Sequence, residues 1–288
     1  MILLLLGISI VLSALRNILS KGITEFKFGT KQFFLVQACI FICGGFVLML
    51  VKTGKFECPA PMTLFYALVY GVLLLSAQYC LTISLKKGNV GICSTVYSLG
   101  FIFPTMSGYL FWNETLTALN VIGIVMVIPA IIVSGMPASK KGQKQKVNSY
   151  ILPLVASMLA SGGLGIMQKV QQSSPYPEQK DLFVICAFAV AGIISLLISL
   201  FVKAEPGIKI RNKLMTALGI GIAFGSCNLL NTILAGKLDS AVFFPVLNIG
   251  GILLSIVSGV AFYKEKISAN DLIVLLLGIG SILLITVA

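Results

Sequence analysis

Side chains that commonly carry out chemistry are scarce in this 288-residue chain, and they are not grouped. There is no histidine, and only nine residues are Asp or Glu, none of them in the middle of an apolar stretch. Six of the seven cysteines lie within apolar stretches, where a buried cysteine behaves as a small hydrophobic residue, and there is no CxxC pair. We therefore expect no catalytic residue, no metal site, no disulfide framework and no cofactor.

Polar side chains inside the apolar stretches are the candidate substrate-binding groups. Amides and hydroxyls that face a shared cavity can bind a small polar solute, and polar groups within a membrane commonly mark such a cavity. The competing interpretation is hydrogen bonding between helices. Asn228 and Asn231 share a helix face because they are three residues apart. The candidates are Arg16, Gln78, Tyr97, Asn228, Asn231 and Asn248.

Arg16 is a fixed cation within the first apolar stretch. Its guanidinium offers a planar fork of donors that suits a carboxylate or a phosphate on a substrate. The alternative is that Arg16 lies about one turn from the helix end and extends to the membrane surface. The two interpretations predict different substrates, anionic in the first case and neutral or cationic in the second.

Ten apolar stretches that position these groups fill almost the whole chain. The chain is 58% hydrophobic and 10% charged, with a mean hydropathy of +1.03. A soluble domain has about 25% charged residues, and a membrane-spanning helix needs about 20 mostly apolar ones. We predict an all-α membrane protein with ten transmembrane helices. The stretches are Ile2–Ser20, Gln32–Val51, Met62–Leu85, Val90–Phe111, Ala118–Met136, Tyr150–Gln168, Asp181–Val202, Leu214–Gly236, Ser240–Phe262 and Asp271–Ala288.

The net charge of +12 comes from basic residues in the connections. Fifteen of them follow the odd-numbered stretches and five follow the even-numbered ones. Because basic loops stay on the cytoplasmic side, this bias predicts a cytoplasmic middle loop and external termini. It also accounts for the charge without nucleic acid as a partner.

The second half of the chain repeats the first. Residues Lys86–Ile122 align with Lys237–Ile273, so that Gly108 and Glu114 meet Gly259 and Glu265. We predict a first five-helix repeat over residues 1–136, a basic linker over 137–149 and a second repeat over 150–288. Because five is odd, the second repeat enters from the opposite side of the membrane, which is a known transporter plan.

These two glycine-then-glutamate helix ends, LGFIFPTMSGYLFWNE and IGGILLSIVSGVAFYKE, resemble the drug/metabolite transporter superfamily, in particular its EamA-like ten-helix family. The resemblance implies two inverted five-helix bundles. It also implies a cavity lined by the first, third, fourth, sixth, eighth and ninth helices, and termini on the cytoplasmic side. We expect Glu114 and Glu265 to be structural, pairing with lysines or helix N-termini. Pro104 and Pro245 are expected to interrupt or hinge their helices.

The sequence therefore predicts a secondary transporter that moves a small polar or amphipathic metabolite by alternating access. We expect an exporter or exchanger, monomeric or homodimeric, that crosses a bacterial cytoplasmic membrane several times. Its partners would be a small-molecule substrate and the lipid bilayer. An intramembrane enzyme would need a nucleophile–base pair, paired carboxylates or a metal cluster within the spans, and none is present. A channel or a structural membrane subunit is the alternative.

Overall fold

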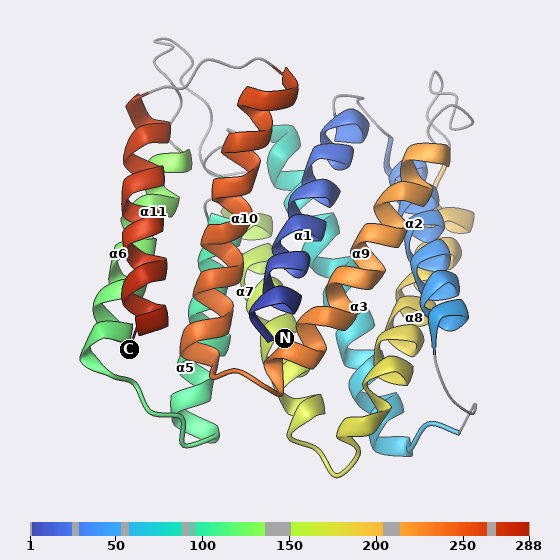
Figure 1. Cartoon of the computed structure of the whole chain (residues 1–288). Coiled ribbons are helices and arrows are strands. Elements are labelled where there is room, and N and C mark those ends of the chain that lie inside the picture. The colour runs from blue at the N-terminus through green and yellow to red at the C-terminus, as the bar shows by residue number, and fades with distance from the viewer. Residues whose placement is uncertain are drawn as a thin grey trace. The chain divides into compact units, whose positions relative to one another are not determined.

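The computed structural model describes residues 2–24, 29–52, 58–87, 93, 96–135, 151–203, 214–263 and 269–287. Within these ranges it contains ten α-helices, two short 3₁₀ helices and no strand (Figure 1). The prediction of an all-α chain is therefore confirmed for the described residues.

The helices begin and end close to the predicted apolar stretches, because uninterrupted runs of apolar residues separate short polar connections. They are α1 (Ile2–Thr24), α2 (Thr30–Val51), α3 (Pro61–Lys87), η1 (Leu99–Phe101), α5 (Ile102–Phe111), α6 (Ala118–Gly135), α7 (Ile151–Gln172), η3 (Pro177–Gln179), α8 (Lys180–Phe201), α9 (Leu214–Ala235), α10 (Ser240–Tyr263) and α11 (Ala269–Val287).

Five of these helices, α2, α3, α7, α8 and α9, are long and apolar enough to cross a membrane within the described ranges. Shorter apolar segments lie in α1, in α6, in α10, in α11 and over the residues leading into and forming α5. Large apolar side chains are exposed on many of them, for example Phe201 at 86% and Leu152 at 80%. This exposure fits an apolar surrounding medium, since soluble monomers rarely expose contiguous apolar patches of more than a few hundred Å².

The two candidate hinge prolines lie in different settings. Pro104 is the third residue of α5, directly after the 3₁₀ turn η1, where a missing backbone N–H interrupts no established helical ladder. Pro245 is the sixth residue of α10, and the helix continues across it to Tyr263. The first helix also differs from its apolar stretch, because α1 continues to Thr24, four residues beyond Ser20.

The chain forms two compact units, and each unit contains segments from both halves of the sequence. Unit 1 comprises Met1–Leu75 and Met167–Gly236, and unit 2 comprises Ser76–Ile166 and Lys237–Ala288. The unit boundaries fall inside α3 and inside α7. The predicted boundary at residues 137–149 lies outside the described residues and refers to the sequence repeat, which stays a prediction.

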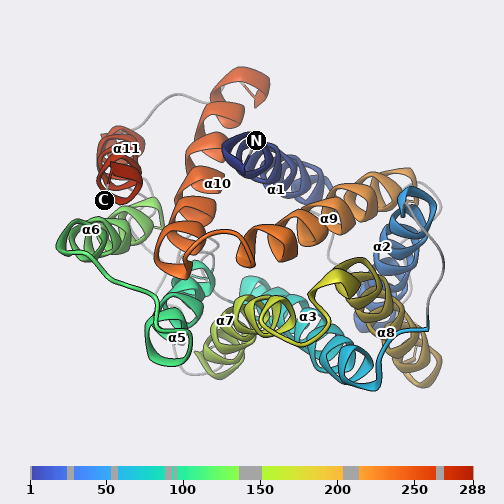
Figure 2. The ribbon, with the colours of Figure 1, turned by 60° about the horizontal axis from the view of Figure 1, so that its bottom comes forward.

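In unit 1, α2 packs against both α8 and α9 (Figures 1 and 2). Glycines allow the close approach: a Cβ on Gly44 of α2 would lie 2.7 Å from the carbonyl oxygen of Gly221 on α9. Three buried rings fill the space beside them, with Phe41 edge-on to Phe188 at 5.6 Å and Phe224 at 5.4 Å from Phe188. The glycine pair Gly44-Gly45 therefore serves helix packing.

In unit 1, α2 and α8 each place a glycine against the other helix. Gly44 of α2 lies against Phe188 of α8, and Gly192 of α8 lies against Phe41 and Ile42 of α2. Gly192 follows Gly44 by 148 positions, close to the offset of the sequence repeat. Each helix thus presents a glycine to a segment of the other helix that contains a phenylalanine.

A second pair of contacts in unit 1 follows the same relation. A Cβ on Gly71 of α3 would lie 2.6 Å from the carbonyl oxygen of Ala187 on α8. A Cβ on Gly221 of α9 would lie 2.6 Å from the carbonyl oxygen of Ile40 on α2. Gly221 follows Gly71 by 150 positions, so a helix of the first half and a helix of the second half make equivalent backbone contacts.

In unit 2, α6 lies beside α11 and α5 beside α10 (Figures 1 and 2). Gly123 of α6 meets Ile285 of α11, where a Cβ would lie 2.5 Å from Cγ1 of that side chain. Gly100 and Gly162 form a second close approach, with a Cβ on Gly162 only 2.8 Å from the Gly100 carbonyl oxygen. Small residues thus determine helix spacing in this unit too.

Candidate binding site

Three helices of unit 1 are joined by a buried chain of hydrogen bonds. The Gln168 side-chain amide of α7 donates to the Tyr70 hydroxyl of α3 at 2.8 Å, and that hydroxyl donates to the Asn228 amide oxygen of α9 at 2.6 Å. Asn228 in turn donates to the Phe224 carbonyl oxygen at 2.8 Å. All three side chains are at most 5% exposed. The amide of Asn228 is therefore used in helix–helix contact.

A second polar group joins α1 to α9. Ser9, which is fully buried, donates from its hydroxyl to the amide oxygen of Asn231. The Asn231 amide donates to the sulfur of Cys227 at 3.6 Å, and Cys227 donates to the Ser9 carbonyl oxygen at 3.6 Å. Asn231 is half-buried, so part of its amide lies at the surface of unit 1.

Arg16 lies on the same face of α1 as Ser9, two turns further along. Its guanidinium carbon is 3.9 Å from the centroid of the Phe224 ring. Phe224 is the eleventh residue of the 22-residue helix α9, and α1 continues for eight residues beyond Arg16, which is about 12 Å of helix. The guanidinium therefore lies beside the middle of α9 rather than at a helix end.

Unit 2 holds the other three predicted binding residues. Asn248 of α10 is half-buried and donates to the Phe244 carbonyl oxygen of its own helix at 2.9 Å. Gln78 of α3 and Tyr97, which precedes η1, are also half-buried. The structure thus groups the six candidates as three in unit 1 and three in unit 2.

Glu114 is engaged with the start of α10 in unit 2. Its carboxylate accepts the backbone N–H of Ser240 at 2.7 Å and the Ser240 hydroxyl at 3.3 Å. Ser240 is the first residue of α10, where unpaired N–H groups favour a negative charge. This contact agrees with the structural role expected for Glu114. Gly259 lies within α10, and Glu265 lies outside the described residues.

The end of α5 explains why a glycine precedes this glutamate. Asn113 has a positive φ of 52°, a conformation in which asparagine commonly ends a helix. The Gly108 carbonyl oxygen accepts both the Trp112 and the Glu114 N–H, which folds the chain back over the last turn. A Cβ on Gly108 would lie 2.1 Å from a carboxylate oxygen of Glu114. The glycine therefore leaves the space that the carboxylate occupies.

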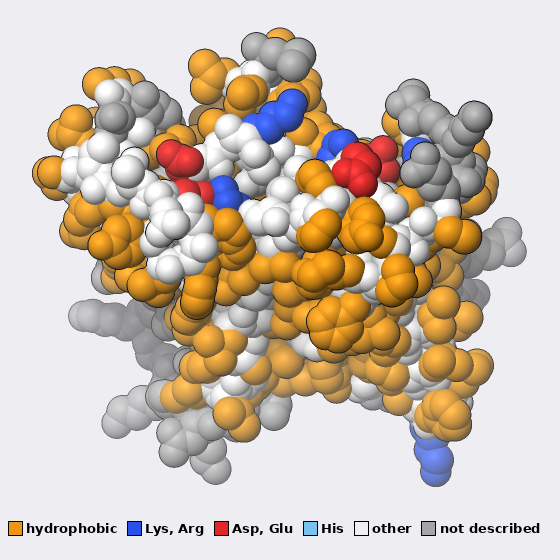
Figure 3. Space-filling model, turned by 90° about the horizontal axis from the view of Figure 1, so that it is seen from below, with side chains coloured by type: hydrophobic (Ala, Val, Ile, Leu, Met, Phe, Trp, Pro, Cys, Tyr) orange, Lys and Arg blue, Asp and Glu red, His pale blue; other side chains and the backbone are white. Residues whose placement is uncertain are grey.

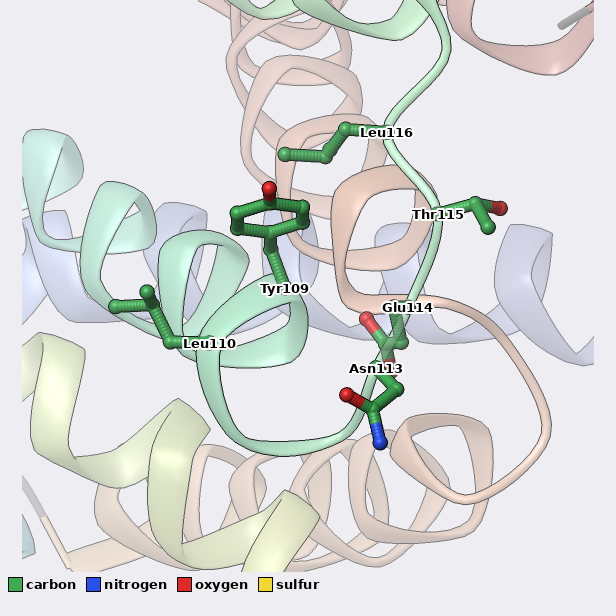
Figure 4. Close-up of a pocket in the computed structure, with 6 residues that line it drawn as sticks. All are labelled: Tyr109, Leu110, Asn113, Glu114, Thr115 and Leu116. Atoms are coloured by element: carbon green, nitrogen blue, oxygen red, sulfur yellow. The ribbon is translucent and has the colours of Figure 1, made fainter.

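A wide-open pocket of about 560 Å³ lies beside this turn, lined by the residues drawn in Figure 4. Its charged group is Glu114, which α10 already engages. On the face drawn in Figure 3, charged side chains are few and lie among apolar and uncharged ones. Within the described residues there is also no group of three His, Cys, Asp or Glu side chains placed to hold a metal ion.

Tyr70, Gln168 and Ser9 belong to these networks, yet the sequence analysis did not select them. Each is a polar residue within or at the edge of an apolar run, as the selected residues are. What distinguishes them is a partner 98 to 222 positions away in the sequence, which only the fold reveals.

Comparison with known proteins shows that a solved structure has a similar fold. No protein-family model and no curated protein matches the chain. A solved crystal structure, described only as that of a protein, has a TM-score of 0.76 over 99% of this chain and 96% of that chain, at 17% sequence identity. The chain thus shares its fold with that structure over nearly its full length. It belongs to the class of all-helical proteins with several apolar helices of membrane-crossing length.

Proposed function

We propose that this chain is a secondary transporter that crosses the bacterial cytoplasmic membrane ten times. It would move a small polar or amphipathic metabolite by alternating access, as an exporter or exchanger. We assign it to the EamA-like family of the drug/metabolite transporter superfamily, on the resemblance of its two glycine-then-glutamate helix ends.

The observation that supports this proposal is the reciprocal packing in unit 1. Gly44 and Gly192 exchange equivalent contacts, and so do Gly71 and Gly221, at offsets close to that of the sequence repeat. Two five-helix halves related in this way must enter the membrane from opposite sides. Inverted halves are typical of carriers, which expose one site alternately to the two faces of the membrane.

Polar groups inside apolar helices give the second line of support. An amide or hydroxyl left unpaired in a membrane costs a few kcal/mol, so exposed ones tend to line a water-filled cavity. Asn228 is fully used within unit 1, whereas Arg16, Asn231, Gln78, Tyr97 and Asn248 each keep some exposure. These five remain our candidates for substrate contact.

Flux in proteoliposomes tests the proposal. Vesicles holding the purified full-length chain are loaded with unlabelled metabolites, and uptake of labelled metabolite against this load is measured. A carrier gives saturable uptake that accelerates when the opposite side holds substrate. A channel gives flux that rises linearly with concentration and shows no such acceleration, and a structural subunit gives no flux; either result would refute the proposal.

A further inference from the structure

The positive charge of Arg16 is not balanced by any carboxylate of the chain in the described structure. The guanidinium contact that the structure shows is with the Phe224 ring, and no described residue forms an ion pair with it. Among the α-helices of unit 1, Asp181 in the first turn of α8 is the one acidic residue. Among the residues that the structure describes, this half-buried cation in apolar helices therefore has no carboxylate as counter-charge.

The stacking on Phe224 also prepares this cation for a ligand. The guanidinium carbon lies 3.9 Å from the ring centroid, and a contact of this kind involves the ring face, which takes the place of no hydrogen-bond acceptor of a ligand. The ring itself is held by its neighbours, since Phe224 is 6% exposed and packs against Phe41 and Phe188. The donors are thus presented from a rigid support, which reduces the entropy lost when a ligand binds.

The neighbouring polar groups compete little for the same ligand. Ser9, Cys227 and Asn231 form hydrogen bonds with one another along the α1–α9 contact, so these groups are already engaged beside Arg16. A single guanidinium fork matches the two oxygens of a carboxylate and neutralises one negative charge.

We propose that Arg16 binds the carboxylate of the transported substrate, so that the substrate class is a small carboxylic acid anion. This inference rests on the proposed transport function, and it identifies the charge that the substrate must carry. The ligand brings the counter-charge that Arg16 does not find among the described residues, and its carboxylate accepts the N–H groups of the guanidinium.

Ligand-induced thermal stabilisation of the purified full-length protein tests the proposal without transport. The probes are matched pairs that differ in charge but little in size: benzoate with benzamide, and hexanoate with hexanamide, together with inorganic phosphate. The variants are Arg16→Gln, Arg16→Lys and, as a control that removes an exposed positive charge elsewhere in unit 1, Lys203→Gln.

We expect at least one carboxylate probe to raise the Tm while its amide does not. In Arg16→Gln the apparent dissociation constant should rise about 10- to 100-fold, the loss expected for hydrogen bonds to a charged group. Arg16→Lys keeps the charge but loses the planar fork of donors, so its apparent dissociation constant should lie between those of Arg16→Gln and the wild type. Lys203→Gln should bind as the wild type does.

Three results would overturn the inference. Stabilisation by the amide as strong as by the acid, unchanged in Arg16→Gln, would show a neutral substrate. Stabilisation by phosphate but by neither carboxylate would show another anion class. No stabilisation by any probe, together with saturable exchange of a neutral or cationic metabolite in vesicles, would refute a carboxylate substrate but agree with the proposed transport function. The absence of saturable flux for every class of metabolite would refute the proposed transport function itself.

Discussion

A methyl group added at Gly108 should release Glu114 from the start of α10. The new Cβ would lie 2.1 Å from a Glu114 carboxylate oxygen and 2.6 Å from the Ser240 Cβ, and real atoms do not approach so closely. The carboxylate must then leave the Ser240 N–H. Losing a charge-assisted hydrogen bond costs about 1.5–3 kcal/mol, and crowding adds about 1–3 kcal/mol, so we expect Gly108→Ala to destabilise the protein by about 2.5–6 kcal/mol.

The single tryptophan makes this change measurable. Trp112 lies between Gly108 and Glu114, so its fluorescence reports the turn while far-UV circular dichroism reports all helices. We expect Gly108→Ala to shift the Trp112 emission in the folded protein and to lower the midpoint of unfolding in detergent. Gly7→Ala is the matched control, because nothing lies within 4 Å of a Cβ at that position.

A double-mutant cycle separates the cap from simple crowding. If Gly108→Ala acts by displacing the carboxylate, Glu114→Ala should remove most of the same stability. The double variant should then fall short of the sum of the single ones by about 0.5–3 kcal/mol. Strict additivity, or a Gly108→Ala variant as stable as Gly7→Ala, would refute the argument that the glycine exists to admit the glutamate.

Other expected outcomes concern helix contacts and orientation. Tyr70→Phe removes the partner of the Gln168 side-chain N–H and of the Asn228 amide oxygen and should lower the free energy of unfolding by about 1–2 kcal/mol in a detergent titration, whereas the half-exposed Tyr66→Phe should change it little. Gly44→Ala should destabilise by about 1–3 kcal/mol in the same titration, because its Cβ would meet backbone; Gly219→Ala, where the nearest atom is 3.4 Å away, should be tolerated. In intact cells, a cysteine at Ser139 should resist an impermeant thiol reagent, since the charge bias places the middle loop inside, and ready labelling would reverse the orientation.

Helix positions were predictable from the sequence because apolar runs and polar connections alternate cleanly. The start of α9 at Leu214 and that of α10 at Ser240 coincide with the predicted stretches. The first helix is the exception: the apolar run ends at Ser20, yet α1 continues to Thr24. One of the two interpretations of Arg16 took the end of the apolar run as the end of the helix, whereas eight residues of α1 follow Arg16.

Side-chain partners were not predictable in the same way, because they depend on contacts between helices far apart in the sequence. Nothing local to Asn228 shows that its amide is fully used by Tyr70 and a backbone carbonyl. The glutamate at the end of α5 was expected to be structural, but its partner Ser240 lies 126 positions away. Pattern and spacing identified the polar residues, and the fold determines which of them still have unsatisfied donors.

The interleaving of the two halves has a consequence for how the protein is made. The first segment of unit 1 ends at Leu75, and its second segment ends only at Gly236. At about 5–20 residues per second, a ribosome needs about 10–30 seconds to supply the intervening chain. α2 is in the nascent chain from the start of that time, whereas α8 and α9, the helices that cover its glycine face, are completed only toward its end. The glycine face of α2 therefore lacks its native partners until the second half of the chain has been made.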